Sequence, residues 1–272
     1  MVIQVIIPVS IVGALGLLFG LGLSYASKKF EVKTDERIPL VREVLPGANC
    51  AACGYTGCDG FAEAVVNGEA KVSGCPVGGA TVADKIAEIM GVESNAEEEK
   101  VAQVICNGTK ENCKTKYNYE GIEDCVSANA IYGGPSACLY GCIGLGTCAR
   151  ACPFDAIIVE DGVAKVMDGK CTACGICVKS CPKNIIRLVP KTDRHMVNCS
   201  SLDKGAIVRQ NCKVGCIGCM RCVKACPVGA ISMNGTLAVI DNEKCTNCGE
   251  CAKVCPTKAI KSYSGSRTYI CV

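Results

Sequence analysis

The chain has 272 residues and a formal net charge of +3, and 26 of its residues are cysteines. Eleven of these cysteines stand in C-x2-C groups, which argues against a disulfide framework of the kind found in short secreted proteins and indicates metal or cluster ligands. Tryptophan is absent and there are only four phenylalanines, so the small domains would depend on bound clusters for their stability.

A 25-residue run without charge, from Val2 to Ala26, opens the chain. An α-helix of that length spans about 37 Å, so the run predicts one transmembrane helix. Lys28 and Lys29 follow at once and nothing basic precedes the run, which predicts an outside N-terminus and cytoplasmic domains at the inner cell membrane. The alternative is a cleaved signal peptide, which is usually shorter and begins with a charged region.

Residues 27–91 form the next predicted domain, with cysteines spaced C-x2-C-x4-C-x16-C. The apolar patterns of Asp59 to Val66 and of Thr81 to Met90 predict two helices. Four cysteines with none to spare predict one [4Fe–4S] cluster, and a structural zinc site is the alternative. The predicted ligands are Cys50, Cys53, Cys58 and Cys75.

An internal duplication follows an acidic linker, residues 92–124. At an offset of 74 residues, the cysteines of residues 199–272 superpose on those of residues 125–198, and Gly141-Cys-Ile-Gly144 recurs as Gly215-Cys-Ile-Gly218. The sequence therefore predicts two tandem ferredoxin-like modules.

Each module is expected to be a small α+β fold, with the helices in the cysteine-bearing segments. Short hairpins should turn at Asp161-Gly162 and at Asn234-Gly235, which lie between apolar residues. The predicted fold class of the chain is accordingly α+β: a transmembrane helix, a small cluster domain and two modules with two clusters each.

The second module contains two runs spaced C-x2-C-x2-C-x3-C-P. In bacterial-type ferredoxins the fourth cysteine of such a run ligates the cluster of the other run. The predicted ligand sets are Cys216, Cys219, Cys222 and Cys255 for one cluster, and Cys245, Cys248, Cys251 and Cys226 for the other.

The first module departs from this pattern, because Leu145 stands where the second module has Cys219. We expect Cys138 to be recruited instead, giving the set Cys138, Cys142, Cys148 and Cys181. A three-iron cluster is the alternative. The partner cluster is predicted to take Cys171, Cys174, Cys177 and Cys152.

Six cysteines then have no assignment, and Cys271, next to the C-terminus, is expected to be a free thiol. Four of the other five could close a sixth cluster between the modules, or all could be buried free thiols. These five are Cys106, Cys113, Cys125, Cys199 and Cys212. The sequence thus predicts five [4Fe–4S] clusters, or six if this last site exists.

Other features narrow the function. Cysteines are expected to act as ligands, so no catalytic residue is predicted, and neither a nucleotide-binding loop nor an array typical of nucleic-acid binding is found. Residues 162–230 carry twelve lysines and arginines against three aspartates, a net of +9. This basic surface could steer an acidic donor such as ferredoxin, or could only compensate cluster charge.

The order of these elements resembles the RnfB family, the polyferredoxin-like subunits of the membrane Rnf complex. The resemblance rests on the anchor, on Cys50-Ala-Ala-Cys53-Gly-Tyr-Thr-Gly-Cys58, on Gly74-Cys75-Pro76 and on the two modules, where short members have one. It implies a subunit that relays electrons from reduced ferredoxin toward NAD, coupled to Na⁺ or H⁺ export. It also implies that the NAD site, flavins and ion path lie largely on other membrane and peripheral subunits.

Two other functions share part of this pattern. A polyferredoxin subunit of a hydrogenase or other dehydrogenase would have the ferredoxin runs, but would not require the Cys50–Cys75 domain beside a membrane helix. A zinc-ribbon or disulfide-linked interaction protein would bind no iron.

Overall fold

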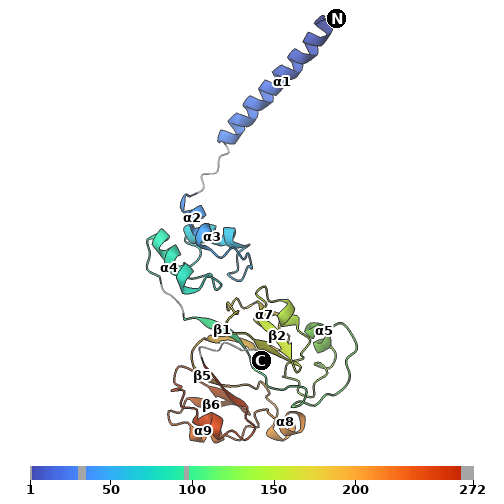
Figure 1. Cartoon of the computed structure of the whole chain (residues 1–272), viewed down its shortest axis with the longest axis vertical. Helices are drawn as coiled ribbons and strands as arrows, with labels where there is room; N and C mark the ends of the chain where they lie inside the picture. Colours follow the sequence, from blue (N-terminus) through green and yellow to red (C-terminus); the bar gives the residue numbers. More distant parts are fainter. Residues whose placement is uncertain (1, 30–34, 95–97, 265–272) are drawn as a thin grey trace.

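The computed structural model describes residues 2–29, 35–94 and 98–264, and it is a mixed α/β structure. Helix α1 (Val2–Lys29) extends away from the other elements, which form a helical domain followed by two modules (Figure 1). Within the described ranges, no helix combines the length and the apolarity that a bilayer span requires. The predicted transmembrane helix from Val2 to Ala26 is therefore not confirmed and stays a prediction.

The N-terminal domain consists of α2 (Arg37–Val44), α3 (Cys58–Val66) and α4 (Gly79–Met90). Its core is formed by one fully buried side chain from each helix, namely Val41, Phe61 and Ile86. The two helices predicted here are confirmed, since α3 and α4 begin one and two residues before the predicted starts. Helix α2 lies in a segment for which no helix was predicted.

The first module opens with a strand that the sequence did not indicate. Strand β1 (Lys100–Val104) pairs antiparallel with β4 (Ile186–Pro190), and Val101 lies opposite Val189 in the shared core. The prediction that residues 92–124 are only a linker is therefore wrong. The acidic residues that suggested a linker precede β1, whereas the buried residues of β1 are too few to announce a strand by themselves.

Between β1 and β4 lie the remaining elements of this module. They are α5 (Cys125–Ala130), α6 (Thr147–Arg150), β2 (Ile157–Glu160), β3 (Val163–Val166) and α7 (Ile176–Ser180). Strands β2 and β3 form the predicted hairpin, with Asp161 and Gly162 at its turn in the left-handed region at φ 52° and 79°. Positive φ at both central residues matches the twist of a two-residue hairpin.

The second module repeats this arrangement (Figure 1). Strand β5 (Arg194–Val197) pairs with β8 (Ile260–Tyr263), as β1 pairs with β4. The other elements are α8 (Gly205–Asn211), α9 (Arg221–Ala225), β6 (Ile231–Asn234), β7 (Leu237–Ile240) and α10 (Glu250–Lys253). Strands β6 and β7 form the hairpin predicted at Asn234-Gly235.

The module boundary needs correction. Strand β5 falls inside the predicted first module, residues 125–198, but it completes the second one by pairing with β8. The cysteine repeat could not reveal this, because it marks ligands, whereas a strand is assigned by a partner distant in the sequence. The modules also touch directly: Gln103 Nε2 donates to Tyr263 Oη over 3.0 Å, and Ser200 Oγ to the Ile105 carbonyl over 3.0 Å.

Candidate iron–sulfur sites

The N-terminal domain brings its four predicted ligands around one cavity, lined by Cys50, Cys53, Cys58 and Cys75. The side chain of Asn49 shapes this loop, because its Oδ1 accepts the Cys58 amide over 2.9 Å. Asn49 and Ala51 both have positive φ, at 45° and 54°, which lets the backbone wrap tightly around the cavity. The four thiols are thus placed as one ligand set.

In the second module the crossed grouping predicted from the two runs is found. One cavity is lined by Cys216, Cys219, Cys222 and, from the other run, Cys255. For the remaining set, burial raises the pKa of Cys251, and nearby Cys245, Cys248 and Cys226 raise it further. Such electrostatic coupling requires the four sulfurs to lie near one another.

The partner site of the first module is also grouped as predicted. Burial raises the pKa of Cys177 to about 12, with further contributions from Cys171, Cys174 and Cys152. Cys152 comes from the neighbouring run, so the crossing of ligands occurs in both modules.

The other site of the first module differs from the prediction. Its cavity is lined by Cys125, Cys142, Cys148 and Cys181, whereas Cys138 lines a different cavity. The expected recruitment of Cys138 is therefore corrected: Cys125 occupies the place left by Leu145. With four cysteines present, nothing in the geometry favours the three-iron alternative.

Local hydrogen bonds explain this placement of Cys125. Asp124 caps α5 by accepting the Ser127 amide over 2.9 Å, and its other oxygen accepts from Thr147 Oγ1 over 2.7 Å. The same Thr147 hydroxyl accepts the Cys125 amide over 2.7 Å, which holds Cys125 beside Cys148 at the start of α6.

Cys138 is drawn the other way by backbone pairing. The amide of Ala137 donates to the Lys114 carbonyl over 2.7 Å, and Thr115 forms an antiparallel bridge with Ser136. These contacts place Cys138 beside Cys113 rather than in the ferredoxin-like loop.

The loop around Leu145 nevertheless keeps the shape of its three cysteine-bearing counterparts. In every run the residues before and after the second ligand position have positive φ. These pairs are Gly144 and Gly146, Ala173 and Gly175, Gly218 and Met220, and Asn247 and Gly249. Loss of the cysteine has therefore left the backbone of the loop unchanged.

The donor sets fit [4Fe–4S] clusters. Each cavity or group offers four cysteines, and backbone amides point at several sulfurs, as the N–H···S bonds of Ala156 to Cys152 (3.4 Å) and Ala230 to Cys226 (3.3 Å) show. The described residues contain no group of three or more His, Cys, Asp or Glu side chains arranged to hold a single metal ion. A cubane presents four irons at different corners, so its thiolates do not converge on one point.

Neighbouring sites lie close enough to influence one another. Cys177 contributes to the raised pKa of Cys148, which links the two sites of the first module. Cys50 contributes to the raised pKa of Cys174, which links the N-terminal site to that module.

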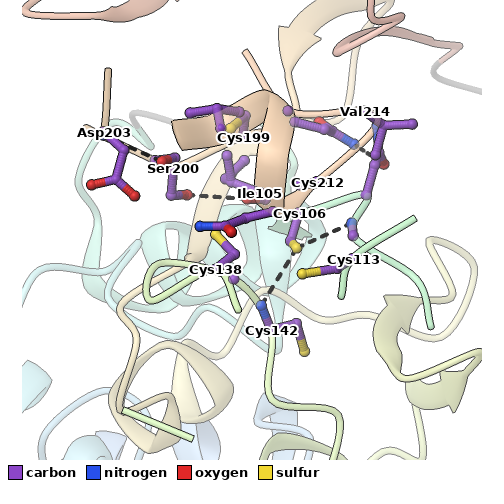
Figure 2. A pocket seen from close by; sticks show the side chains of 18 residues that line it. Ile105, Cys106, Cys113, Cys138, Cys142, Cys199, Ser200, Asp203, Cys212 and Val214 are labelled. Atoms are coloured by element: carbon purple, nitrogen blue, oxygen red, sulfur yellow. Dashed lines mark hydrogen bonds between the residues drawn. The ribbon is translucent and has the colours of Figure 1, made fainter. Parts of the chain in front are cut away.

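Five cysteines remain, and they gather around one further cavity between the modules (Figure 2). They are Cys106, Cys113, Cys138, Cys199 and Cys212. Four of them were predicted for a sixth site, and Cys138 replaces Cys125 in that group. Cys271 lies outside the described residues.

Family models match three parts of the chain. Residues 45–77 match a family described as "Putative Fe-S cluster", and residues 140–186 and 215–259 each match a 4Fe-4S dicluster domain. These ranges contain most of the cysteines grouped above, but not Cys106, Cys113, Cys125, Cys138, Cys199 or Cys212.

Curated relatives cover nearly the whole chain. The B subunit of the Na(+)-translocating ferredoxin:NAD(+) oxidoreductase complex of Acetobacterium woodii is 48% identical over 89% of this chain and 73% of its own length. The B subunit of the ion-translocating oxidoreductase complex of Methanosarcina acetivorans is 43% identical, over 87% and 90%. The B subunit of the proton-translocating ferredoxin:NAD(+) oxidoreductase complex of Clostridium ljungdahlii is 42% identical, over 90% and 86%. The chain therefore belongs to the RnfB family, the B subunits of ion-translocating oxidoreductase complexes.

Proposed function

We propose that this chain is the electron-relay subunit of a membrane-bound ferredoxin:NAD oxidoreductase whose reaction is coupled to Na⁺ or H⁺ transport. The observation that carries the proposal is the presence of five four-cysteine sites in a chain 42–48% identical to B subunits of such complexes. Bound [4Fe–4S] clusters would supply one-electron transfer, while the cysteines hold them and the backbone amides tune them.

The arrangement of the sites supports a relay. The N-terminal site neighbours the Cys174 site, and that site neighbours the one that contains Cys148. Crossed ligands join the two sites within each module, since each run places one cysteine at the site of the other run. Electrons could therefore pass from site to site within a module, and between the first module and the N-terminal site.

An electron donor would enter at the second module. Cys219 and Cys248 are exposed, in contrast to the half-buried or buried thiols of the first module. Met220 is 47% exposed beside Cys219, and the exposed Arg221 and Lys224 follow on α9. An accessible cluster rimmed by positive charge fits the approach of an acidic ferredoxin.

Membrane attachment would come from the uncharged N-terminal run. Leu17 and Leu21 of α1 are each 70% exposed, which leaves an apolar surface without cover among the described residues. The basic Lys28 and Lys29 favour a cytoplasmic location for the domains that follow.

Anaerobic purification of the full chain tests this function. We expect a coloured protein that is reduced by reduced ferredoxin, recovered in the membrane fraction and co-purified with other subunits. A variant lacking residues 2–26 should keep its iron but move to the soluble fraction. A colourless chain with stoichiometric zinc would contradict the relay, and unchanged membrane recovery of the truncated variant, expressed without other subunits, would contradict the anchor.

A further inference from the structure

The cavity between the modules holds five cysteines, and the family models cover none of them as part of a cluster run. We call it the intermodule site and define it by Cys106, Cys113, Cys138, Cys199 and Cys212. Figure 2 shows these thiols around a common space, with Cys106 near its centre. The segments come from both modules: Cys106 follows β1 and Cys199 follows β5.

We propose that the intermodule site binds a sixth [4Fe–4S] cluster, with three fixed ligands and a fourth drawn from either member of a cysteine pair. Cys106, Cys138 and Cys199 are the fixed ligands, and Cys113 and Cys212 are the pair. This inference rests on the proposed function only in assuming that the chain binds cubanes.

The sulfurs of the fixed ligands already accept amide hydrogen bonds, as cluster thiolates do. Cys106 Sγ accepts from Gly108 over 3.3 Å and from Cys142 over 3.4 Å. Cys199 accepts the amide of Cys216. Cys142 and Cys216 are equivalent ligand positions of the two modules, so the site lies directly beside one cluster site of each.

The surroundings of the cavity are also built for a bulky occupant that accepts hydrogen bonds. The amide nitrogen of the Asn107 side chain is buried at this cavity with no partner among the described residues. A buried donor without an acceptor is costly, and a cluster sulfide would satisfy it. Two glycines, Gly141 and Gly215, line the cavity close to the sulfurs. A Cβ added at Gly141 would lie 3.6 Å from the sulfurs of Cys106 and Cys138. A Cβ added at Gly215 would lie 3.8 Å from Cys199 Sγ.

Cys113 and Cys212 lie together at one place in the wall of the intermodule cavity. They face each other in an antiparallel bridge, flanked by hydrogen bonds from Lys114 to the Asn211 carbonyl (2.9 Å) and from Lys213 to the Asn112 carbonyl (2.8 Å). Residues so placed form a non-hydrogen-bonded pair, in which the side chains are close. Their thiols are hydrogen-bonded to each other.

Only one of these two sulfurs fits a cubane corner at a time. Thiolates on one cluster lie about 6 Å apart, because a metal–sulfur bond of about 2.3 Å projects outward from each corner. Two sulfurs in hydrogen-bond contact are closer than that. The second thiol therefore lies beside the ligating sulfur and can take its place.

Alanine variants of the full chain, purified without oxygen, test the proposal by iron and sulfide analysis with EPR. We expect about 24 irons per wild-type chain, four per cluster. Cys106→Ala, Cys138→Ala and Cys199→Ala should each fall to between about 20 and about 23, according to whether the cluster is lost or keeps three irons, and the same [4Fe–4S] EPR component should be missing from all three. Cys113→Ala and Cys212→Ala should each keep about 24, whereas the double variant falls in the same way as the other three.

Val208→Ala is the matched control, because Val208 lines the same cavity without being a ligand, and it should keep all its iron. EPR signals of the other five clusters show that a variant has folded. About 20 irons in the wild type, unchanged by Cys106→Ala, would overturn the sixth site while leaving the relay intact. Loss of the component in both single pair variants would overturn the shared corner. Near-zero iron in the wild type would overturn the relay as well.

Discussion

At the scale of single residues, Cys125 and Cys138 have exchanged the places that the ligand spacing suggests. Cys125 precedes the ferredoxin run in the sequence, yet it completes that run's site. Its duplicate in the second module, Cys199, is not needed by a module that retains Cys219, and it lines the intermodule site instead. The two modules thus place equivalent cysteines differently, and they differ in the same way at Leu145 and Cys219.

The exchange predicts opposite effects for two variants. Cys125→Ala should leave the Cys142, Cys148 and Cys181 site with three thiolates, so about one iron is lost and a three-iron EPR signal appears. Cys138→Ala should give no three-iron signal at this site, because its sulfur lies in the other cavity. EPR of the oxidised proteins makes the comparison.

A cysteine introduced at position 145 should rescue the four-iron cluster in the Cys125→Ala variant. Since Gly144 and Gly146 hold the same left-handed conformation as Gly218 and Met220, a sulfur at position 145 should reach the cluster. Leu145→Cys added to Cys125→Ala should therefore abolish the three-iron signal. Persistence of that signal would contradict the assignment of Cys125.

At the scale of elements, the first cluster loop of each module is packed against the hairpin of that module. A Cβ at Gly144 would lie 2.4 Å from the carbonyl oxygen of Gly162, in the turn between β2 and β3. The equivalent Gly218 would meet the Thr236 carbonyl at 2.8 Å. Because backbone cannot rotate away as a side chain can, glycine is required at both places.

Gly144→Ala should therefore destabilise the first module. The left-handed φ of +80° alone costs about 1–3 kcal/mol for a residue with a Cβ, and the collision with the turn adds to it. We expect the visible absorbance of the clusters to be lost at a lower temperature under anaerobic heating. Gly169→Ala is the control, since its Cβ meets nothing within 4 Å, and equal losses in both variants would refute the argument.

At the scale of the whole molecule, the exposed cysteines are confined to one module of the part that the structure describes. Cys219 and Cys248 are the two exposed thiols there, and positive side chains such as Arg221 and Lys224 lie nearby in the sequence. The first module and the N-terminal domain bury their cysteines more deeply, beside each other. This asymmetry gives the chain an accessible end and a protected end.

Charge reversal beside Cys219 tests whether the electron donor docks at the accessible end. Arg221→Glu combined with Lys224→Glu should slow reduction by ferredoxin about tenfold or more at low ionic strength, because attraction becomes repulsion. The difference should shrink as salt is added, since exposed charges are screened. Stopped-flow reduction of the purified chain measures both effects.

Arg187→Glu with Arg209→Glu is the control of equal net charge, placed on β4 and α8. It should change the rate much less. The iron content of both double variants must match the wild type, so that rates report docking. Equal slowing by both pairs would mean that net charge, and not the positive side chains beside Cys219, directs the donor.

The sequence by itself determined the local features: the ligand runs, the crossed sets of the second module, the N-terminal site, the hairpin turns at Asp161 and Gly235, and the family. A tight loop around a cluster fixes its ligands within a few residues, so spacing is enough to recognise it. Only the tertiary structure decided that β1 and β5 open the modules, that Cys125 lies beside Cys142, Cys148 and Cys181, and that five cysteines share one cavity. Each of these depends on pairing between distant segments, where loop closure is opposed by entropy and local sequence carries no record of the partner.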